Sequence, residues 1–304
     1  MAWEKAGLLY VPQSAHPKLT THASNPLPVW LHGDVYRVYF SGRDESNRSS
    51  VGFADIDVVR GTVEYEHDRP VFIHGEQGTF YSHGVSIGNC YEAGGKRYIL
   101  FMGWQCPDGA HWLGEVGCLH LSEDWSLHLD SDTPFMALDN EDPVSLSYPW
   151  VHRKQDGMYR MWYGSTKTWD AGNDEMVHII KGASSQDGRA WHKTGTALPF
   201  ALGVAQAFSR PTVIVDDLGY HMWFSYRPGG NKSTYRIGYA TSEDGDAWTL
   251  RLDEAGIDVS TSGWDSEMIE YPYVFEHQGR RLMMYNGNGY GKSGIGLAVY
   301  DGPR

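Results

Sequence analysis

The sequence is poor in cysteine, in positive charge and in long apolar runs, and each shortage excludes a class of protein. It has only 3 cysteines in 304 residues and no Cys-x-x-Cys pair, which argues against a disulfide framework and a structural zinc site. The net charge of -13 argues against a general nucleic-acid binder or a protein of anionic membranes. No stretch approaches the roughly 18 apolar residues of a membrane-spanning helix. The first residues also lack a secretion signal, so we expect a cytoplasmic protein.

Motifs for metals and nucleotides are scarce as well. The chain has no P-loop, and no pair of histidines has the spacing of a metal site on a helix. The glycine-rich segment at residues 286–291 follows one predicted strand and precedes another, so we interpret it as a hairpin loop. We therefore predict no metal and no cofactor.

What the chain has in abundance is aromatic residues and glycine, which together indicate short strands and tight turns. Aromatic residues make up 13% of the sequence, and there are 36 glycines. A glycine-containing turn followed by an alternating aromatic strand occurs five times. The five copies recur about every 61 residues and end at Phe40, Met102, Tyr163, Phe224 and Tyr285.

This repeat predicts the fold. Four short antiparallel strands per unit, repeated around an axis, are typical of a β-propeller blade. We therefore predict an all-β protein, a single five-bladed β-propeller with about 61 residues per blade, that forms one domain over residues 1–304. A solenoid is the rival fold, but the repeat is long for one and no polar capping unit is present. The tryptophans that recur at fixed blade positions are predicted to lie in the core: Trp162, Trp191, Trp223 and Trp248.

A propeller places function at one mouth of its central channel. In each blade, the start of the first strand and the end of the second strand lie at the same side, because these strands are antiparallel neighbours. Polar and aromatic residues there that do not repeat between blades are therefore candidates for a shared site. The candidates are Arg43, Asp44, His83, Trp104, Tyr148, Arg210, Arg227, Asp265, Glu267, Glu270, Tyr271 and Asn288.

These residue types suggest chemistry on sugars. Two carboxylates across a pocket can hydrolyse a glycosidic bond, and arginines bind carboxylate or phosphate groups of a substrate. Structural interpretations stay open for several of them. Arg43 and Asp44 are also consistent with a local ion pair, Arg210 and Arg227 with neutralisation of Glu267 or Glu270, and Asp265 with a loop cap.

The repeat resembles the five-bladed propeller glycosidases of glycoside hydrolase families 32, 43, 68, 117 and 130. Residues 220–225 and 235–245 are typical of that group, and residues 263–272 and 285–291 resemble a less studied branch close to family 32. The resemblance implies an acidic trio in the central pocket. Two positions depart from it: Ser24 to Pro26 stand where an aspartate is usual, and His83 stands where the branch often has an acid, so His83 is a candidate proton shuttle.

We therefore predict a glycoside hydrolase-like enzyme that acts on a sugar-containing, anionic substrate, a small molecule or an oligosaccharide. Glu270 or Glu267 is the predicted general acid and Asp44 the predicted base or nucleophile. The predicted substrate-binding residues are Arg43, His83, Trp104, Tyr148, Arg210, Arg227, Asp265, Tyr271 and Asn288. Two alternatives remain: phosphorylase-like transfer of a glycosyl group to phosphate, and a non-hydrolytic tailoring or binding propeller of a biosynthetic cluster.

Overall fold

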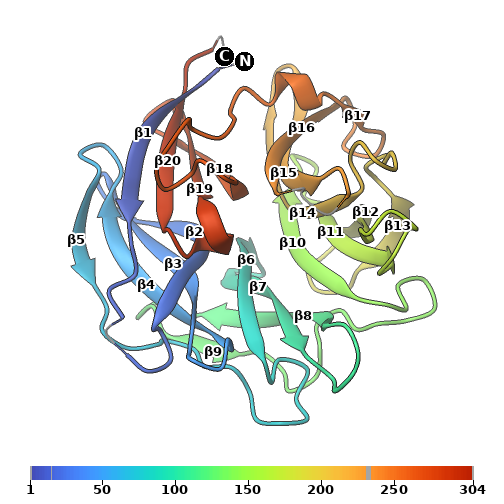
Figure 1. Ribbon diagram of the computed structural model, residues 1–304, viewed down its shortest axis with the longest axis horizontal. Coiled ribbons are helices and arrows are strands. Elements are labelled where there is room, and N and C mark those ends of the chain that lie inside the picture. Colours follow the sequence, from blue (N-terminus) through green and yellow to red (C-terminus); the bar gives the residue numbers. More distant parts are fainter. Residues whose placement is uncertain (1, 15, 231–233, 303–304) are drawn as a thin grey trace.

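The strands form five antiparallel blades around a central axis (Figure 1). In a computed structural model, the chain is described for residues 2–14, 16–230 and 234–302. Within these residues, helix is limited to the short elements η1 (Leu252–Glu254) and α1 (Asn288–Gly291). None of the described helices has the length and hydropathy needed to cross a membrane. The predicted all-β class is confirmed.

Each blade has four strands, which follow one another from the axis outward. Blade I consists of β2 (Thr21–His32), β3 (Val35–Arg43), β4 (Ser49–Asp57) and β5 (Thr62–Glu66). Blade II consists of β6 (Gly84–Ala93), β7 (Lys96–Gln105), β8 (Leu113–Leu121) and β9 (Leu127–Leu129). Blade III consists of β10 (Leu146–Arg153), β11 (Tyr159–Thr168), β12 (Val177–Ser185) and β13 (His192–Thr196). Blade IV consists of β14 (Ala207–Asp216), β15 (Gly219–Arg227), β16 (Arg236–Ser242) and β17 (Thr249–Leu250), and blade V of β18 (Glu270–His277), β19 (Arg280–Asn286), β20 (Ile295–Tyr300) and β1 (Trp3–Tyr10).

The first strand of the chain closes the ring. Strand β1 pairs antiparallel with β20, with Trp3 opposite Tyr300 and Tyr10 opposite Ile295, so blade V is made from both ends of the chain. The innermost strands also make a closed circle of contacts, because each of β2, β6, β10, β14 and β18 contacts the next and β18 contacts β2. The sequence period does not reveal that the first ten residues belong to the last blade.

A bulge interrupts every innermost strand at the same place. The register against the second strand shifts just after residues Ser24, Ile87, Ser147, Ser209 and Glu270. In four blades the next residue has a positive φ and precedes a proline: Asn25 (59°), Tyr148 (24°), Arg210 (47°) and Tyr271 (52°). The prolines, expected near the strand starts, therefore lie within the strands, and the bulge redirects the side chains beside it.

Three of the four recurrent tryptophans lie in the core, as predicted. Trp162 and Trp223 are fully buried, and Trp248 is nearly so. The indole nitrogen of Trp162, in blade III, donates a hydrogen bond of 3.0 Å to the carbonyl of Gly245 in the β16–β17 turn of blade IV. Trp191 is partly buried and packs against a second hydrophobic cluster.

A buried arginine connects the bulges of four blades. Arg210, at the bulge of blade IV, donates hydrogen bonds to the carbonyls of Tyr271 (2.8 Å), Pro26 (2.7 Å) and Gly88 (3.4 Å), which belong to blades V, I and II. Its exposed fraction is 3%. Burial lowers its pKa to about 10, so the guanidinium remains charged at neutral pH. These bonds satisfy carbonyls that the bulges leave free of the sheet.

Replacing this arginine tests its structural role. R210M removes the donors and leaves buried carbonyls without partners, so we expect the free energy of unfolding to fall by about 3 kcal/mol. The measurement is urea denaturation followed by tryptophan fluorescence. R69M, at a side chain that is 76% exposed, is the control and is expected to change stability little. An unchanged urea midpoint for R210M would contradict this role.

Candidate functional site

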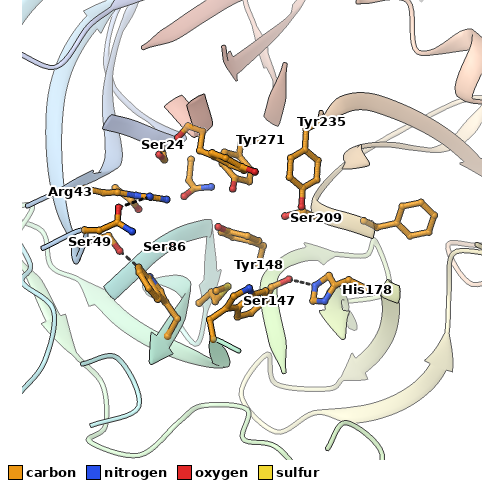
Figure 2. A pocket seen from close by; sticks show the side chains of 18 of the residues that line it. Ser24, Arg43, Ser49, Ser86, Ser147, Tyr148, His178, Ser209, Tyr235 and Tyr271 are labelled. Carbon is orange, nitrogen blue, oxygen red and sulfur yellow. Dashed lines mark hydrogen bonds between the residues drawn. The ribbon is translucent and has the colours of Figure 1, made fainter. Parts of the chain in front are cut away.

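A cavity of about 410 Å³ lies at the axis, and side chains from all five blades line it (Figure 2). Two kinds of group dominate its wall. Six serines contribute hydroxyls and seven aromatic residues contribute rings: Ser24, Ser41, Ser49, Ser86, Ser147, Ser209, Trp104, Trp112, Tyr148, Phe208, Tyr235, Tyr271 and Tyr290. The remaining lining residues include two cations, Arg43 and Arg227, and none of the described lining residues is Asp or Glu. The wall is therefore rich in hydroxyls and aromatic rings and includes two guanidinium groups.

A buried carboxyl group belongs to the residue just before Tyr271 of this wall. Glu270 occupies the position before the bulge of blade V, and its counterparts Ser24, Ser147 and Ser209 in blades I, III and IV all line the cavity. Glu270 is fully buried, and neither carboxyl oxygen has a hydrogen-bond partner. Blade V therefore places a buried acid where three other blades place a serine.

The environment of Glu270 favours its protonated form. Burial raises its pKa well above the ordinary value, and the charges of Arg227 and Arg43 act in the opposite direction. The effect of burial is the larger one, so the carboxyl group holds its proton to a higher pH than an exposed glutamate does. A protonated carboxyl next to a cavity is the form required of a general acid.

The two arginines lie at the ends of second strands. Arg227, at the end of β15, donates a hydrogen bond of 2.7 Å to Glu175 and lies over the ring of Tyr235, and its Nε is buried without a partner. Arg43, at the end of β3, donates to Asn47 Oδ1 at 2.7 Å. Both guanidinium groups line the cavity, so they are placed to bind an anionic group of a ligand.

Asp44 lies outside the lining and is held by its own loop. Its carboxylate accepts hydrogen bonds from the backbone N–H groups of Ser46 and Arg48 and from the Arg48 side chain, and Lys18 lies 3.6 Å away. Burial raises its pKa, but these hydrogen bonds and charges outweigh burial and leave the pKa below its usual value. The local Arg43–Asp44 ion pair that the sequence allows does not form in the described structure. The predicted role of Asp44 as base stays a prediction that this placement does not favour.

Asp265 also makes its contacts away from the cavity. It is 2% exposed and makes a salt bridge of 2.7 Å with Lys5, which anchors the N-terminal strand, and it accepts a hydrogen bond from Tyr285. Burial raises its pKa, but the hydrogen bonds from Lys5, Ser260 and Tyr285 lower it by more. Asp265 does not line the cavity, and its contacts fix the closing blade instead.

Four further candidates, Glu267, Asn288, His83 and Arg210, are not among the lining residues of the cavity. Glu267 is exposed, and its backbone N–H donates to the side chain of Asn288, which thereby shapes the loop. His83 accepts a hydrogen bond from the backbone N–H of Cys106, a residue that does line the cavity. Arg210 is not among the lining residues either, because its donors serve the backbone carbonyls of the bulges.

The structure brings Arg43, Trp104, Tyr148, Arg227 and Tyr271 together in one wall. The sequence analysis missed other lining residues, His178 and Tyr235 among them. His178 lies at the start of β12, the third strand of blade III. Tyr235 lies just before β16, the third strand of blade IV. The signal was available, because a third strand begins at the end of the sheet where its antiparallel second strand stops.

Two short glycine motifs at the cavity lack the structure that would give them chemical meaning. Residues 84–88 have the Gly-x-Ser-x-Gly spacing around Ser86, but they form the continuous strand β6 instead of a strand-to-helix turn. Residues 289–294 have the Gly-x-Gly-x-x-Gly spacing, but they lead into β20, and α1 has only 4 residues. In the described part of the chain, no group of three or more His, Cys, Asp or Glu side chains is placed to hold a metal ion.

Sequence comparison identifies two mycobacterial relatives. No family model matches the chain. A Mycobacterium tuberculosis H37Rv protein, "Uncharacterized protein Rv1502", is 43% identical over 303 residues, which cover 99% of this chain and 100% of the relative. "Uncharacterized protein MT1551" of strain CDC 1551 has the same identity and coverage.

Several solved structures that share the fold are named as glycoside hydrolases. A structure named "Glycoside hydrolase" superposes with a TM-score of 0.75 at 15% identity and covers 99% of this chain and 92% of its own. A second structure has a TM-score of 0.72 at 14% identity and covers 99% of this chain and 94% of its own. It is named "The GH130 family of mannoside phosphorylases contains glycoside hydrolases that target beta-1,2 mannosidic linkages in Candida mannan". A thermostable family-43 glycoside hydrolase has a TM-score of 0.68 at 14% identity and covers 94% of this chain and 93% of its own. The predicted resemblance to five-bladed propeller glycosidases is confirmed for the fold.

The buried acid predicts a pH-dependent cost in stability. As pH rises above the ordinary glutamate pKa of 4.5, Glu270 loses its proton in the unfolded chain but keeps it in the folded one, so folding becomes less favourable. E270Q does not titrate. We expect its stability relative to the wild type to rise between pH 4.5 and 7, by up to about 1.4 kcal/mol per pH unit.

Urea denaturation of both proteins at several pH values measures this difference, and all other titrating groups cancel in it. E267Q, which changes an exposed carboxyl in the same segment, is the matched control. A difference between E270Q and wild type that stays constant with pH would show that folding leaves the pKa of Glu270 unchanged.

Proposed function

We propose that this chain, which belongs to the same family as the Mycobacterium tuberculosis protein Rv1502, is an enzyme that cleaves a glycosidic bond in its axial cavity. The observation that carries the proposal is the buried, unpartnered carboxyl of Glu270, the residue just before Tyr271 in a wall of hydroxyls and aromatic rings. The fold, shared with glycoside hydrolases, supports the proposal by analogy only.

Glu270 is the proposed proton donor. Cleavage of a glycosidic bond needs an acid that protonates the leaving oxygen, and a carboxyl with a raised pKa is the usual donor. Glu270 has that property because it is buried, and it directly precedes Tyr271, which lines the cavity. Glu267, the other predicted acid, is exposed and outside the lining, so it is the weaker candidate.

The proposed substrate carries an anionic group. Arg43 and Arg227 are the two Arg or Lys side chains among the described lining residues, and they stand out in a chain of net charge -13. A carboxylate or phosphate on the substrate satisfies the free guanidinium donors. The aromatic side chains offer flat apolar surfaces for a sugar ring. Trp104 is held for this by a hydrogen bond of 3.1 Å from its indole nitrogen to Ser49.

Phosphorolysis is the second candidate, and the composition of the wall favours it. The hydrolases with two carboxylates use one of them to activate water or to attack carbon, and no described lining residue is acidic. Phosphate held by Arg43 and Arg227 carries its own negative charge and needs no base. One structural neighbour is named for a family of mannoside phosphorylases.

The first test is turnover of a panel of aryl glycosides, glycosyl uronides and sugar-phosphate glycosides, with and without inorganic phosphate. We expect E270Q to lower kcat by about 100-fold or more on substrates with poor leaving groups, since these need a proton from the enzyme. E267Q, the control, is expected to retain most of the activity. Full activity of E270Q, or no cleavage of any glycoside by the wild type, would contradict the proposal.

The anion-binding role of the arginines predicts a selective defect. R227M is expected to raise KM for an anionic glycoside by about 10-fold or more, because one charged hydrogen-bonding group is lost. The KM for a neutral glycoside of the same sugar should change much less. R236M, on the neighbouring strand and outside the lining, is the control. Equal effects of R227M on both substrates would exclude a specific anion site.

A further inference from the structure

A serine and a histidine of blade III are hydrogen-bonded to each other in the cavity wall. Ser147 Oγ lies 2.6 Å from His178 Nε2, and Nδ1 of the same ring lies 2.7 Å from Thr166 Oγ1 (Figure 2 shows the Ser147–His178 bond). All three side chains are about 1% exposed, yet Ser147 and His178 line the cavity. This is the arrangement of a reacting hydroxyl, a base and a group that orients the base.

The histidine is neutral, so one nitrogen of its ring can accept a proton. Burial, with a smaller effect from Arg227, lowers its pKa to about 3, so the imidazole is neutral. When Nδ1–H donates to Thr166, Nε2 is left as the acceptor for the Ser147 hydroxyl proton. The backbone N–H of Thr166 donates to the Ser145 carbonyl at 2.9 Å, which fixes the orienting residue.

The surrounding backbone makes room for this pair. Gly164 lies opposite Ser147 in the β10–β11 pairing. A Cβ at residue 164 would collide with both Ser147 Oγ and His178 Nε2, so the close approach of the two side chains depends on glycine there.

The other blades do not repeat the pair. The pairings of β11 with β12 and of β15 with β16 make Ser209 and Tyr235 of blade IV the counterparts of Ser147 and His178. Blade IV thus has the serine without a histidine. Because packing does not require the histidine at this position, its presence in blade III needs another reason.

Ser147 and Glu270 stand on different sides of the axis. They occupy equivalent positions before the bulges of blades III and V, and these blades are not neighbours in the ring. A sugar bound in the cavity therefore has a protonated acid on one side and the Ser147–His178 pair on another. Cleavage with inversion of configuration needs an acid and a base on opposite faces of the sugar.

We propose that Ser147 and His178 form the base side of the reaction, an inference that rests on the proposed function. Water forms a bond from its oxygen to the anomeric carbon and gives a proton to Ser147 Oγ, while Ser147 passes its own proton to His178 Nε2. Glu270 gives its proton to the leaving oxygen as the glycosidic bond breaks. Thr166 is a positioning residue that holds the ring.

This arrangement supplies the group that the wall otherwise lacks. The described lining has no carboxylate to activate water, and the serine–histidine relay is a neutral replacement for one. The product is the free sugar with inverted anomeric configuration, and the proton taken up by His178 returns to Glu270 through solvent when the products leave.

Azide rescue tests the relay. The substrate is the 2,4-dinitrophenyl glycoside of the sugar that the wild type cleaves, whose leaving group needs no acid. We expect S147A to lower kcat by about 100-fold with little change in KM. Sodium azide, an anion that attacks without a base, should restore turnover and yield the glycosyl azide of inverted configuration. T166V should lower kcat less and also respond to azide.

Matched variants separate the possible results. S209A removes the equivalent hydroxyl of blade IV, and azide should not accelerate it. E270Q should keep turnover of the dinitrophenyl glycoside and lose it on glycosides with poor leaving groups. If S147A does not fold, as judged by circular dichroism, the azide response of T166V decides.

Two results overturn the inference alone. One is a fully active S147A, or an S147A and T166V that azide does not rescue, while E270Q still fails on poor leaving groups. The other is wild-type turnover that requires phosphate and is unaffected by S147A. If E270Q is also fully active on poor leaving groups, the proposed function fails together with the inference.

Discussion

The bulge in each innermost strand organises both the ring of blades and the cavity at its axis. It gives the residue before the proline a positive φ in four blades and leaves backbone carbonyls free of the sheet. Arg210 satisfies three of these carbonyls, from blades V, I and II, with a single buried guanidinium. The innermost strands are therefore held together by backbone contacts and by Arg210. The side chains that line the cavity do not take part in these contacts, so they can differ between blades.

That freedom is where the five blades differ chemically. The position before the bulge is serine in three blades, isoleucine in one and glutamate in blade V. The side chain of this glutamate has no hydrogen-bond partner in the folded protein. It therefore opposes folding at any pH at which it is ionised in the unfolded chain. A buried group that weakens the fold and stands next to a residue of the cavity wall is better explained by chemistry than by packing.

The charged side chains of the cavity wall are positive, whereas the chain as a whole is negative. The acidic residues Asp44 and Asp265 are neutralised in local contacts with Arg48 and Lys5, away from the lining. Arg43 and Arg227 remain in the wall, where Arg227 makes a salt bridge with the buried Glu175. An acidic surface around a cationic cavity disfavours binding of polyanions along the surface, while a small anionic group can still be bound inside.

The all-β class, the five repeats and part of the wall could be predicted from the sequence, because glycine turns, aromatic alternation and the ends of second strands are local features. Arg43, Trp104 and Arg227 could be found in this way. Other features became visible only in the folded chain: Trp3–Tyr10 completes the last blade, Arg210 serves the backbone, and Asp44 is occupied by Arg48. The meeting of His178 with Ser147 across Gly164 is another of them. These contacts could not be predicted because a side chain's partners depend on bulges, burial and the approach of distant strands, and none of these has a signature within a short stretch of sequence.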